Sequence, residues 1–225
     1  MSKMHITRRG MLAAACAGAG MAMLGGGVRP SMAATAPGFK ETTTTMFWVG
    51  EPADAANAFI SNTESYWDKD WLASFGGVDD PFNRDRHWPA GFTPKENPFY
   101  VALPYGELQN DGLLKTEAYE VPWYRPGVAP LLKNRWVEIR HNFRICFAQW
   151  QDVGPCGEDD FAFVFGASLV PLNTFDAKAG LDVSPAVWHA LGMTENALTA
   201  WRFVDNSEVP EGPWTEIVTA SGINR

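Results

Sequence analysis

Two aspartates, each followed within a few residues by a proline, are the sequence feature that most constrains the fold of this chain. Asp152 is followed by Val-Gly-Pro, and Asp182 is followed by Val-Ser-Pro. Ser184 can cap a helix and Pro185 suits its first position, so a short helix is predicted that ends at Gly192. Asp152 is therefore expected at a turn, and Asp182 at the junction between an extended segment and a helix.

β-Branched and aromatic residues predict a mainly β fold. Most of these segments are bounded by turn-forming residues. The expected strands are 42–49, 99–104, 136–139, 144–150 and 198–204, with 161–166 as a further short strand or loop leg.

The segment between the first two strands, residues 51 to 98, has a different character. It is Ala-rich and aromatic at first and loop-like after Gly76-Gly77. Trp67, Trp71 and Phe75 recur at helical spacing. We expect this segment to be an insertion that caps the strands. Because no internal repeat or linker is visible, residues 34 to 225 are expected to form one domain.

Three motifs carry a resemblance to a known group of proteins. They are Gln-Asp-Val-Gly-Pro over 151–155, Leu-Asp-Val-Ser over 181–184, and Ala-Leu-Pro-Tyr-Gly over 102–106. Together they resemble the barrel of the rare lipoprotein A, expansin, membrane-bound lytic transglycosylase A and family-45 endoglucanase group, over roughly residues 99 to 205. The resemblance implies a six-stranded double-psi β-barrel with a short helix. It also implies a polysaccharide such as peptidoglycan or β-glucan as partner.

The same resemblance assigns a role to Asp182. In the hydrolytic members a His-Phe-Asp segment stands at this place and its Asp is the catalytic acid, whereas this chain has Gly-Leu-Asp. Cleavage of a glycosidic bond requires a proton for the leaving oxygen. One carboxyl group suffices for a transglycosylase, but inverting hydrolysis needs a second one roughly 6.5 to 9.5 Å away. The candidates for this second group are, in decreasing order, Asp152, Asp80 and Glu51.

Each acid also has a purely structural interpretation. Asp182 could cap the helix or bind backbone amides, Asp152 could be a turn former, and Asp80, ahead of Pro81, is typical of a loop. Two functions therefore compete: a glycan-cleaving enzyme of lytic transglycosylase or endoglucanase type, and a non-catalytic, expansin-like polysaccharide binder. An inhibitor or scaffold protein is a third class.

Ten tryptophans are many for 225 residues. Sugar rings present apolar faces that stack on indole and phenol, so some of these side chains are expected to line a groove. Packing in the core of a small barrel is the alternative for each of them. The expected substrate-binding residues are Trp48, Glu51, Tyr105, Trp150 and Trp88.

The N-terminus predicts export. Residues 7–12 read Thr-Arg-Arg-Gly-Met-Leu, an apolar stretch runs to Leu24, and small residues stand around Ala33, which together indicate a twin-arginine signal peptide over residues 1–33. The apolar stretch is too short to remain as a membrane span. A lipoprotein ending at Cys16 is the less favoured alternative. The protein is thus expected in the periplasm or outside the cell.

The net charge of the chain limits the kinds of molecule that it is expected to bind. Removal of residues 1–33 deletes four basic residues and no acidic one, which changes the formal net charge from −8 to about −12. Such a surface disfavours nucleic acid and anionic lipid. No His or Cys pair has metal-ligand spacing, so no metal and no cofactor are predicted. The sequence carries no signal of oligomeric state.

Two cysteines remain after the predicted cleavage, Cys146 and Cys156. They flank an expected strand and its turn, and in an oxidising compartment this arrangement favours a disulfide. The alternative is a buried free thiol at one position, with its neighbour exposed.

Overall fold

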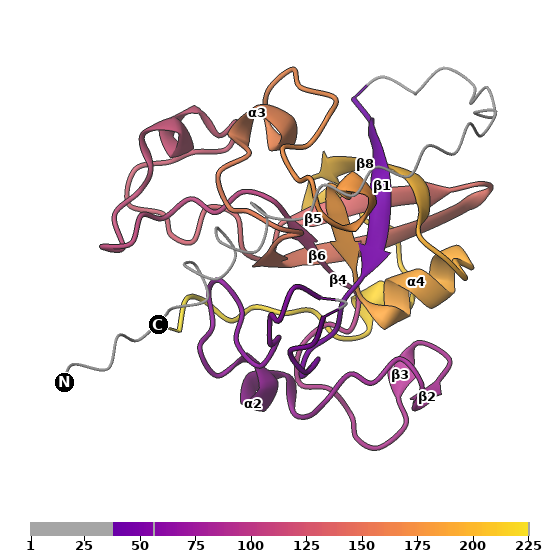
Figure 1. Cartoon of the computed structure of the whole chain (residues 1–225). Helices are drawn as coiled ribbons and strands as arrows, with labels where there is room; N and C mark the ends of the chain where they lie inside the picture. The colour runs from indigo at the N-terminus through magenta and orange to yellow at the C-terminus, as the bar shows by residue number, and fades with distance from the viewer. Residues whose placement is uncertain (1–37, 56, 225) are drawn as a thin grey trace.

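The computed structural model describes residues 38–55 and 57–224 (Figure 1). The predicted signal peptide lies outside the described residues. Within them, six strands close into a barrel, which confirms the predicted mainly β fold. Around the barrel the strands follow the order β1 (Lys40–Met46), β7 (Leu181–Val183), β4 (Tyr100–Leu103), β6 (Arg144–Val153), β5 (Trp136–His141) and β8 (Ala197–Val204).

The barrel mixes parallel and antiparallel pairing. β1 pairs with β7 and β4 pairs with β6 in parallel, while the other four neighbouring pairs run antiparallel. Closure leaves none of the six strands with an unpaired edge. Side chains alternate between the inner and outer faces along each strand.

Apolar residues fill the barrel. Val101 and Leu103 of β4 lie in the main core cluster with Leu181 and Val183 of β7. Tyr100 and Ala102, which alternate with them, belong instead to a second cluster with Phe47 and side chains of the insertion. β4 is therefore buried on both faces, by the barrel core on one side and by the insertion on the other.

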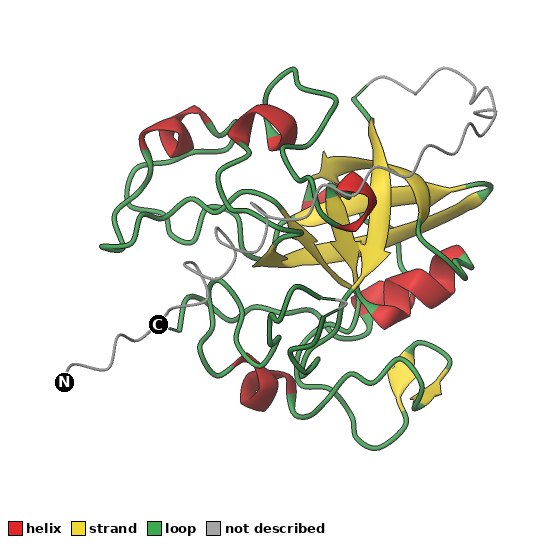
Figure 2. Cartoon of the chain, in the orientation of Figure 1, coloured by secondary structure: helices red, strands yellow, loops and turns green. Residues whose placement is uncertain are grey.

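Side chains of the insertion pack against the outer face of β4. The insertion contains α2 (Trp71–Phe75) and a hairpin of β2 (Arg84–Asp85) and β3 (Trp88–Pro89), which lie below the barrel in the view of Figure 2. Of the three aromatics at helical spacing, Trp71 and Phe75 lie in α2 and Trp67 precedes it; all three are buried.

The predicted strand over 161–166 is wrong. Residues Phe161–Val164 form the short helix α3, because the carboxylate of Asp160 accepts a hydrogen bond from the Phe163 amide and caps it. The sixth strand of the barrel is instead β7, which contains Asp182.

The helix expected after Ser184 is confirmed as α4 (Pro185–Leu191). The Ser184 hydroxyl accepts a hydrogen bond from the Val187 amide at 3.3 Å. Gly192 ends the helix in the left-handed conformation, with φ of 65°, which is a conformation that favours glycine.

The predicted Cys146–Cys156 disulfide is wrong. Cys146 is a free thiol with no exposed surface, and it packs in the barrel core. Burial raises the pKa of the Cys146 thiol well above its ordinary value. The alternative of a buried free thiol therefore holds for Cys146.

Short 3₁₀ turns complete the described chain. They span Thr116–Glu120, Asp176–Lys178, Asn206–Glu208 and Pro213–Thr215. Among the helices of residues 38–55 and 57–224, none has the length and apolar character needed to cross a bilayer.

Candidate functional site

Four residues from four adjacent strands form one row across the barrel wall. Thr45 of β1 is paired with Asp182 of β7. Asp182 is also paired with Ala102 of β4, and Ala102 is in turn paired with Asp152 of β6. Directly paired residues project to the same face of a sheet. Ala102 packs against the insertion, so this row lies on the outer face of the barrel.

A β-bulge brings Asp152 into the row. Val101 is paired with Trp150, whereas the next residue, Ala102, is paired with Asp152, so Gln151 is the extra residue. Strict alternation would direct Trp150 and Asp152 to the same face. The bulge reverses this alternation, and as a result the Trp150 ring lies in the core while Asp152 shares the outer face with Asp182.

Asp182 is partly exposed, and its carboxylate is oriented by a neighbouring strand. The hydroxyl of Thr45 donates a hydrogen bond to Oδ1 of Asp182. The other oxygen, Oδ2, lies toward Gly154, where a Cβ atom would stand 3.5 Å from it. The same Cβ would stand 3.8 Å from the Cβ of Ala102. Two small residues, Gly154 and Ala102, therefore lie next to this part of Asp182.

Asp152 has a different environment although it shares the row. It is only 1 % exposed, and its Oδ1 accepts a hydrogen bond of 2.7 Å from the backbone amide of Tyr66 in the insertion. Two strand spacings, about 9 to 10 Å, separate its Cα from that of Asp182. The predicted pair is thus brought onto one face, but only Asp182 is partly accessible, whereas Asp152 attaches the insertion to the barrel.

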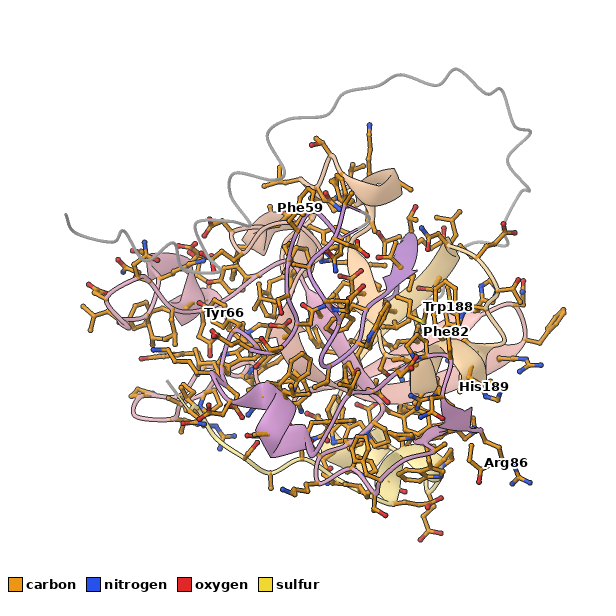
Figure 3. The ribbon with its side chains drawn as sticks, turned by 60° about the horizontal axis from the view of Figure 1, so that its bottom comes forward. Phe59, Tyr66, Phe82, Arg86, Trp188 and His189 are labelled. Carbon is orange, nitrogen blue, oxygen red and sulfur yellow. The ribbon has the colours of Figure 1, made fainter. Side chains whose placement is uncertain are left out.

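The insertion contacts the barrel at a second, distant place. The imidazole of His87, between β2 and β3, packs edge-to-face on that of His189 in α4, with 5.2 Å between ring centroids. Figure 3 shows Tyr66 well separated from His189 and from Arg86, the neighbour of His87. Burial and the nearby His189 lower the pKa of His87. The insertion is therefore attached both at Asp152 and at the helix that follows Asp182.

Asp80 lies in the insertion, and none of the contacts described for residues 38–55 and 57–224 joins it to the row. Its carboxylate accepts a 2.8 Å hydrogen bond from the Phe82 amide, which is the geometry of a local turn. The adjacent Asp79 is fully buried, paired with Arg84 and bonded by the Tyr100 hydroxyl at 2.8 Å. This Asp-Asp-Pro segment anchors the insertion on the outer face of β4.

Glu51 is a buried acid at the start of the insertion. Its Oε2 accepts a 2.6 Å hydrogen bond from Nδ2 of Asn62, and burial raises its pKa from 4.5 to about 7. Among the contacts described for residues 38–55 and 57–224, none links Glu51 to Asp182. Glu51 is therefore a protonatable group near neutral pH, but its position does not make it a partner of the row.

The predicted substrate-binding aromatics divide into two pairs. Trp48 and Trp88 are partly exposed and remain available for stacking. Tyr105 and Trp150 have no exposed surface; the Trp150 ring stacks on Phe203 in the core. For these two the predicted role in a groove is wrong, and the alternative of core packing holds.

Sequence reasoning missed Thr45, Ala102 and Gly154 as parts of the site. Thr45 belongs to a run of four threonines, and nothing in the run distinguishes it until the register with Asp182 is known. Among residues 38–55 and 57–224, no group of three or more His, Cys, Asp or Glu side chains is arranged to hold a metal ion.

Comparison with known proteins adds no relative: no protein-family model matches the chain, and no curated protein matches it. The functional interpretation therefore depends on the geometry of the row and on the sequence motifs.

Proposed function

We propose that this protein is an exported, polysaccharide-acting enzyme that cleaves glycosidic bonds, with Asp182 as general acid on a double-psi β-barrel. Closure of six strands with two parallel pairs supports this barrel type. The Asp-x-Gly-Pro and Leu-Asp-Val-Ser motifs support it as well, because their aspartates, Asp152 and Asp182, share the outer face of the wall at β6 and β7.

The observation that carries the proposal is the environment of the Asp182 carboxylate. It is partly exposed on the barrel wall, one oxygen is fixed by Thr45, and the other lies toward Gly154 and Ala102. A proton donor must be oriented and must also be approachable by the glycosidic oxygen. A larger side chain at Gly154 would contact this carboxylate, because even a Cβ atom there would stand 3.5 Å from Oδ2.

The burial of Asp152 favours a mechanism with one acid. Inverting hydrolysis requires a second carboxylate that can activate a water, yet Asp152 is buried and bonded to the Tyr66 amide. In the one-acid scheme, protonated Asp182 gives its proton to the leaving oxygen as the glycosidic bond breaks. The carboxylate then accepts the proton of a hydroxyl on the same sugar, whose oxygen forms the new bond to the anomeric carbon. The chemistry is that of a lytic transglycosylase.

Incubation of the purified chain with peptidoglycan and with β-glucans, followed by mass spectrometry of the supernatant, tests this function. We expect soluble fragments with anhydro ends from peptidoglycan, and an Asp182→Asn variant that loses 10²-fold or more of the rate because general acid catalysis contributes about that much. Asp159→Asn is the matched control, since Asp159 is an exposed acid paired with Lys115 outside the row.

The products separate the competing functions. Reducing ends in place of anhydro ends would indicate hydrolysis. Hydrolysis would require a second catalytic carboxylate, for which Asp152 and Glu51 are the candidates. Binding to the insoluble polymer without any soluble product would favour the expansin-like binder. Full activity in Asp182→Asn would contradict the role of Asp182.

A further inference from the structure

A pocket of about 320 Å³ opens at the rim of the barrel, where β5 begins and β8 ends. β5 stands three places from β7 in either direction around the six-stranded barrel, so the pocket lies on the side opposite Asp182. Barrel mouths are frequent sites of ligand binding. The side chains that matter here are Trp123, Arg135, Trp136, Phe203, Asp205 and Glu208.

The inner wall of the pocket is aromatic and held in place. The Phe203 ring stacks on Trp150 and on Phe165, with centroids 5.6 and 5.4 Å away, and meets Trp123 edge-to-face at 5.0 Å. Contacts on several sides fix the orientation of these rings. A rigid apolar wall is suited to the C–H face of a sugar ring.

Arg135 supplies hydrogen-bond donors. Its guanidinium carbon stands 4.7 Å from the centroid of the Trp123 ring, and its Nε donates to the Leu131 carbonyl at 3.2 Å. Within the described chain, no residue accepts a hydrogen bond from its two terminal nitrogens. Arg135 is partly buried, and this burial lowers its pKa from the ordinary value. A ligand hydroxyl could accept a hydrogen bond from either terminal nitrogen.

Acceptors stand across the same pocket. Asp205 and Glu208 are exposed carboxylates at the two ends of one 3₁₀ turn. A capping box orders both of them, since Oε2 of Glu208 accepts a 2.9 Å hydrogen bond from the Asp205 amide and the Asp205 side chain accepts from the backbone of the turn. The pocket thus offers fixed acceptors and fixed donors beside an aromatic wall.

We propose that this pocket is a second carbohydrate site, which binds a single pyranose unit of the polysaccharide and anchors the chain away from the site of cleavage. A sugar hydroxyl both donates and accepts, so it matches a pocket that combines one cation with two carboxylates. The charges at the pocket also offset one another, because Glu208 is paired with Arg202 at 3.4 Å and Asp205 lines the pocket with Arg135, so neither a simple anion nor a simple cation is favoured. The inference rests on the proposed function for its choice of ligand.

The test uses the Asp182→Asn protein, so that no substrate is consumed, and the change in tryptophan fluorescence on addition of β-1,4-linked tetramers of glucose or of N-acetylglucosamine. We expect Arg135→Gln to weaken binding by about tenfold or more, the effect of losing hydrogen bonds from a charged group. Asp205→Asn, which keeps a capping side chain, should weaken it as well. Arg140→Gln is the matched control, because Arg140 on β5 also lies over an aromatic ring, Phe39, but is paired with Glu138.

The outcomes for the two proposals are separate. Equal affinity of the tetramers for Arg135→Gln and its parent, or no binding of either tetramer, would overturn the second site even if Asp182 proves to be the general acid. Weakened binding by both pocket variants, in a protein that releases no product with Asp182 intact, would support the second site and reject the cleavage mechanism. A fluorescence change produced by acetate alone at the same concentration, and abolished by Arg135→Gln, would identify an anion site and contradict the proposal.

Discussion

The Thr45 hydroxyl on β1 donates a hydrogen bond to Oδ1 of Asp182 on the parallel strand β7. Thr45 is 2 % exposed, whereas Asp182 is partly exposed, so this contact is partly buried. Removal of the hydroxyl in Thr45→Val leaves the shape of the side chain nearly unchanged but removes the hydrogen bond that orients Oδ1 of Asp182. We expect kcat for glycan release to fall by about tenfold or more with little change in KM, because orientation of a catalytic group acts on the chemical step.

Thr45→Ser is the control for this prediction. It retains the hydroxyl and should restore most of kcat, while both variants should unfold within about 1 kcal/mol of the parent in urea. Equal losses in Thr45→Ser and Thr45→Val would show that packing of the methyl group, and not the hydrogen bond, supports the activity.

Gly106→Ala should destabilise the protein. A Cβ atom at Gly106 would overlap the ring of Tyr66, whose hydroxyl is fixed by 2.8 Å hydrogen bonds to both the carbonyl and the amide of Leu108. The ring cannot move without loss of these bonds, so we expect a decrease of about 1 to 3 kcal/mol in the free energy of unfolding. Gly91→Ala, where the added atom meets nothing within 4 Å, should leave urea unfolding unchanged.

Glu51→Gln should change the pH dependence of stability. Burial raises the pKa of Glu51 from 4.5 to about 7, so the folded state favours the protonated acid. The stability contributed by this group is complete below pH 4.5 and is lost as the pH rises through 7. The neutral glutamine avoids that loss, and the variant should be more stable than the parent at pH 8, by at most about 3 kcal/mol, and equal to it near pH 4.

Urea unfolding at the two pH values measures this difference. Glu211→Gln, an exposed acid, is the control and should match the parent at both. A constant difference between Glu51→Gln and the parent across this range would mean that folding does not raise the pKa of Glu51.

The contact between His87 and His189 should weaken the protein in acid. His87 has a lowered pKa because of burial first and of His189 second; Arg84 and Arg86 lower it further, and the Ala186 carbonyl opposes them. Its contribution to stability is complete above pH 6.5 and is lost as the pH falls below that value. The melting temperature of the parent should therefore fall between pH 7 and pH 5, and that of His87→Gln should fall less.

A control histidine distinguishes this effect from a general one. His141 bonds the Leu198 carbonyl on another part of the barrel. His141→Gln should keep the pH dependence of the parent, and an identical pH dependence in His87→Gln would remove the role assigned to the histidine contact.

Cys146 should resist modification in the folded state. It is fully buried, and its raised pKa keeps the thiol protonated. We expect no labelling of Cys146 by iodoacetamide at pH 8 under native conditions and complete labelling in denaturant, as read by peptide mass spectrometry. Rapid native labelling would show that this part of the core opens readily.

The sequence predicted the strands whose composition is distinctive and the helix whose ends are marked. Ser184 and Gly192 determine α4 locally, so it could be found without tertiary information. The run from Phe161 to Gly166 could not, because a short apolar segment fits a strand or a helix and Asp160 decides for the helix. β7 has only three residues, too few for a periodic signal.

The candidate site was predictable in its acids but not in its geometry. The pairing of Ala102 with both Asp182 and Asp152 depends on register and on a bulge, neither of which is encoded by spacing along the chain. The same reason explains the error on Cys146. Its distance from Cys156 along the sequence contained no information on which of the two side chains would face the core.

The hydrogen bond from the Tyr66 amide to Asp152 spans 86 residues of sequence. Closing so long a loop costs entropy before any contact compensates for it. We therefore expect docking of the insertion to be a late event in folding, after the strands have joined. In a folding intermediate that precedes this event, the carboxylate of Asp152 would be exposed to water, whereas it is buried in the folded protein.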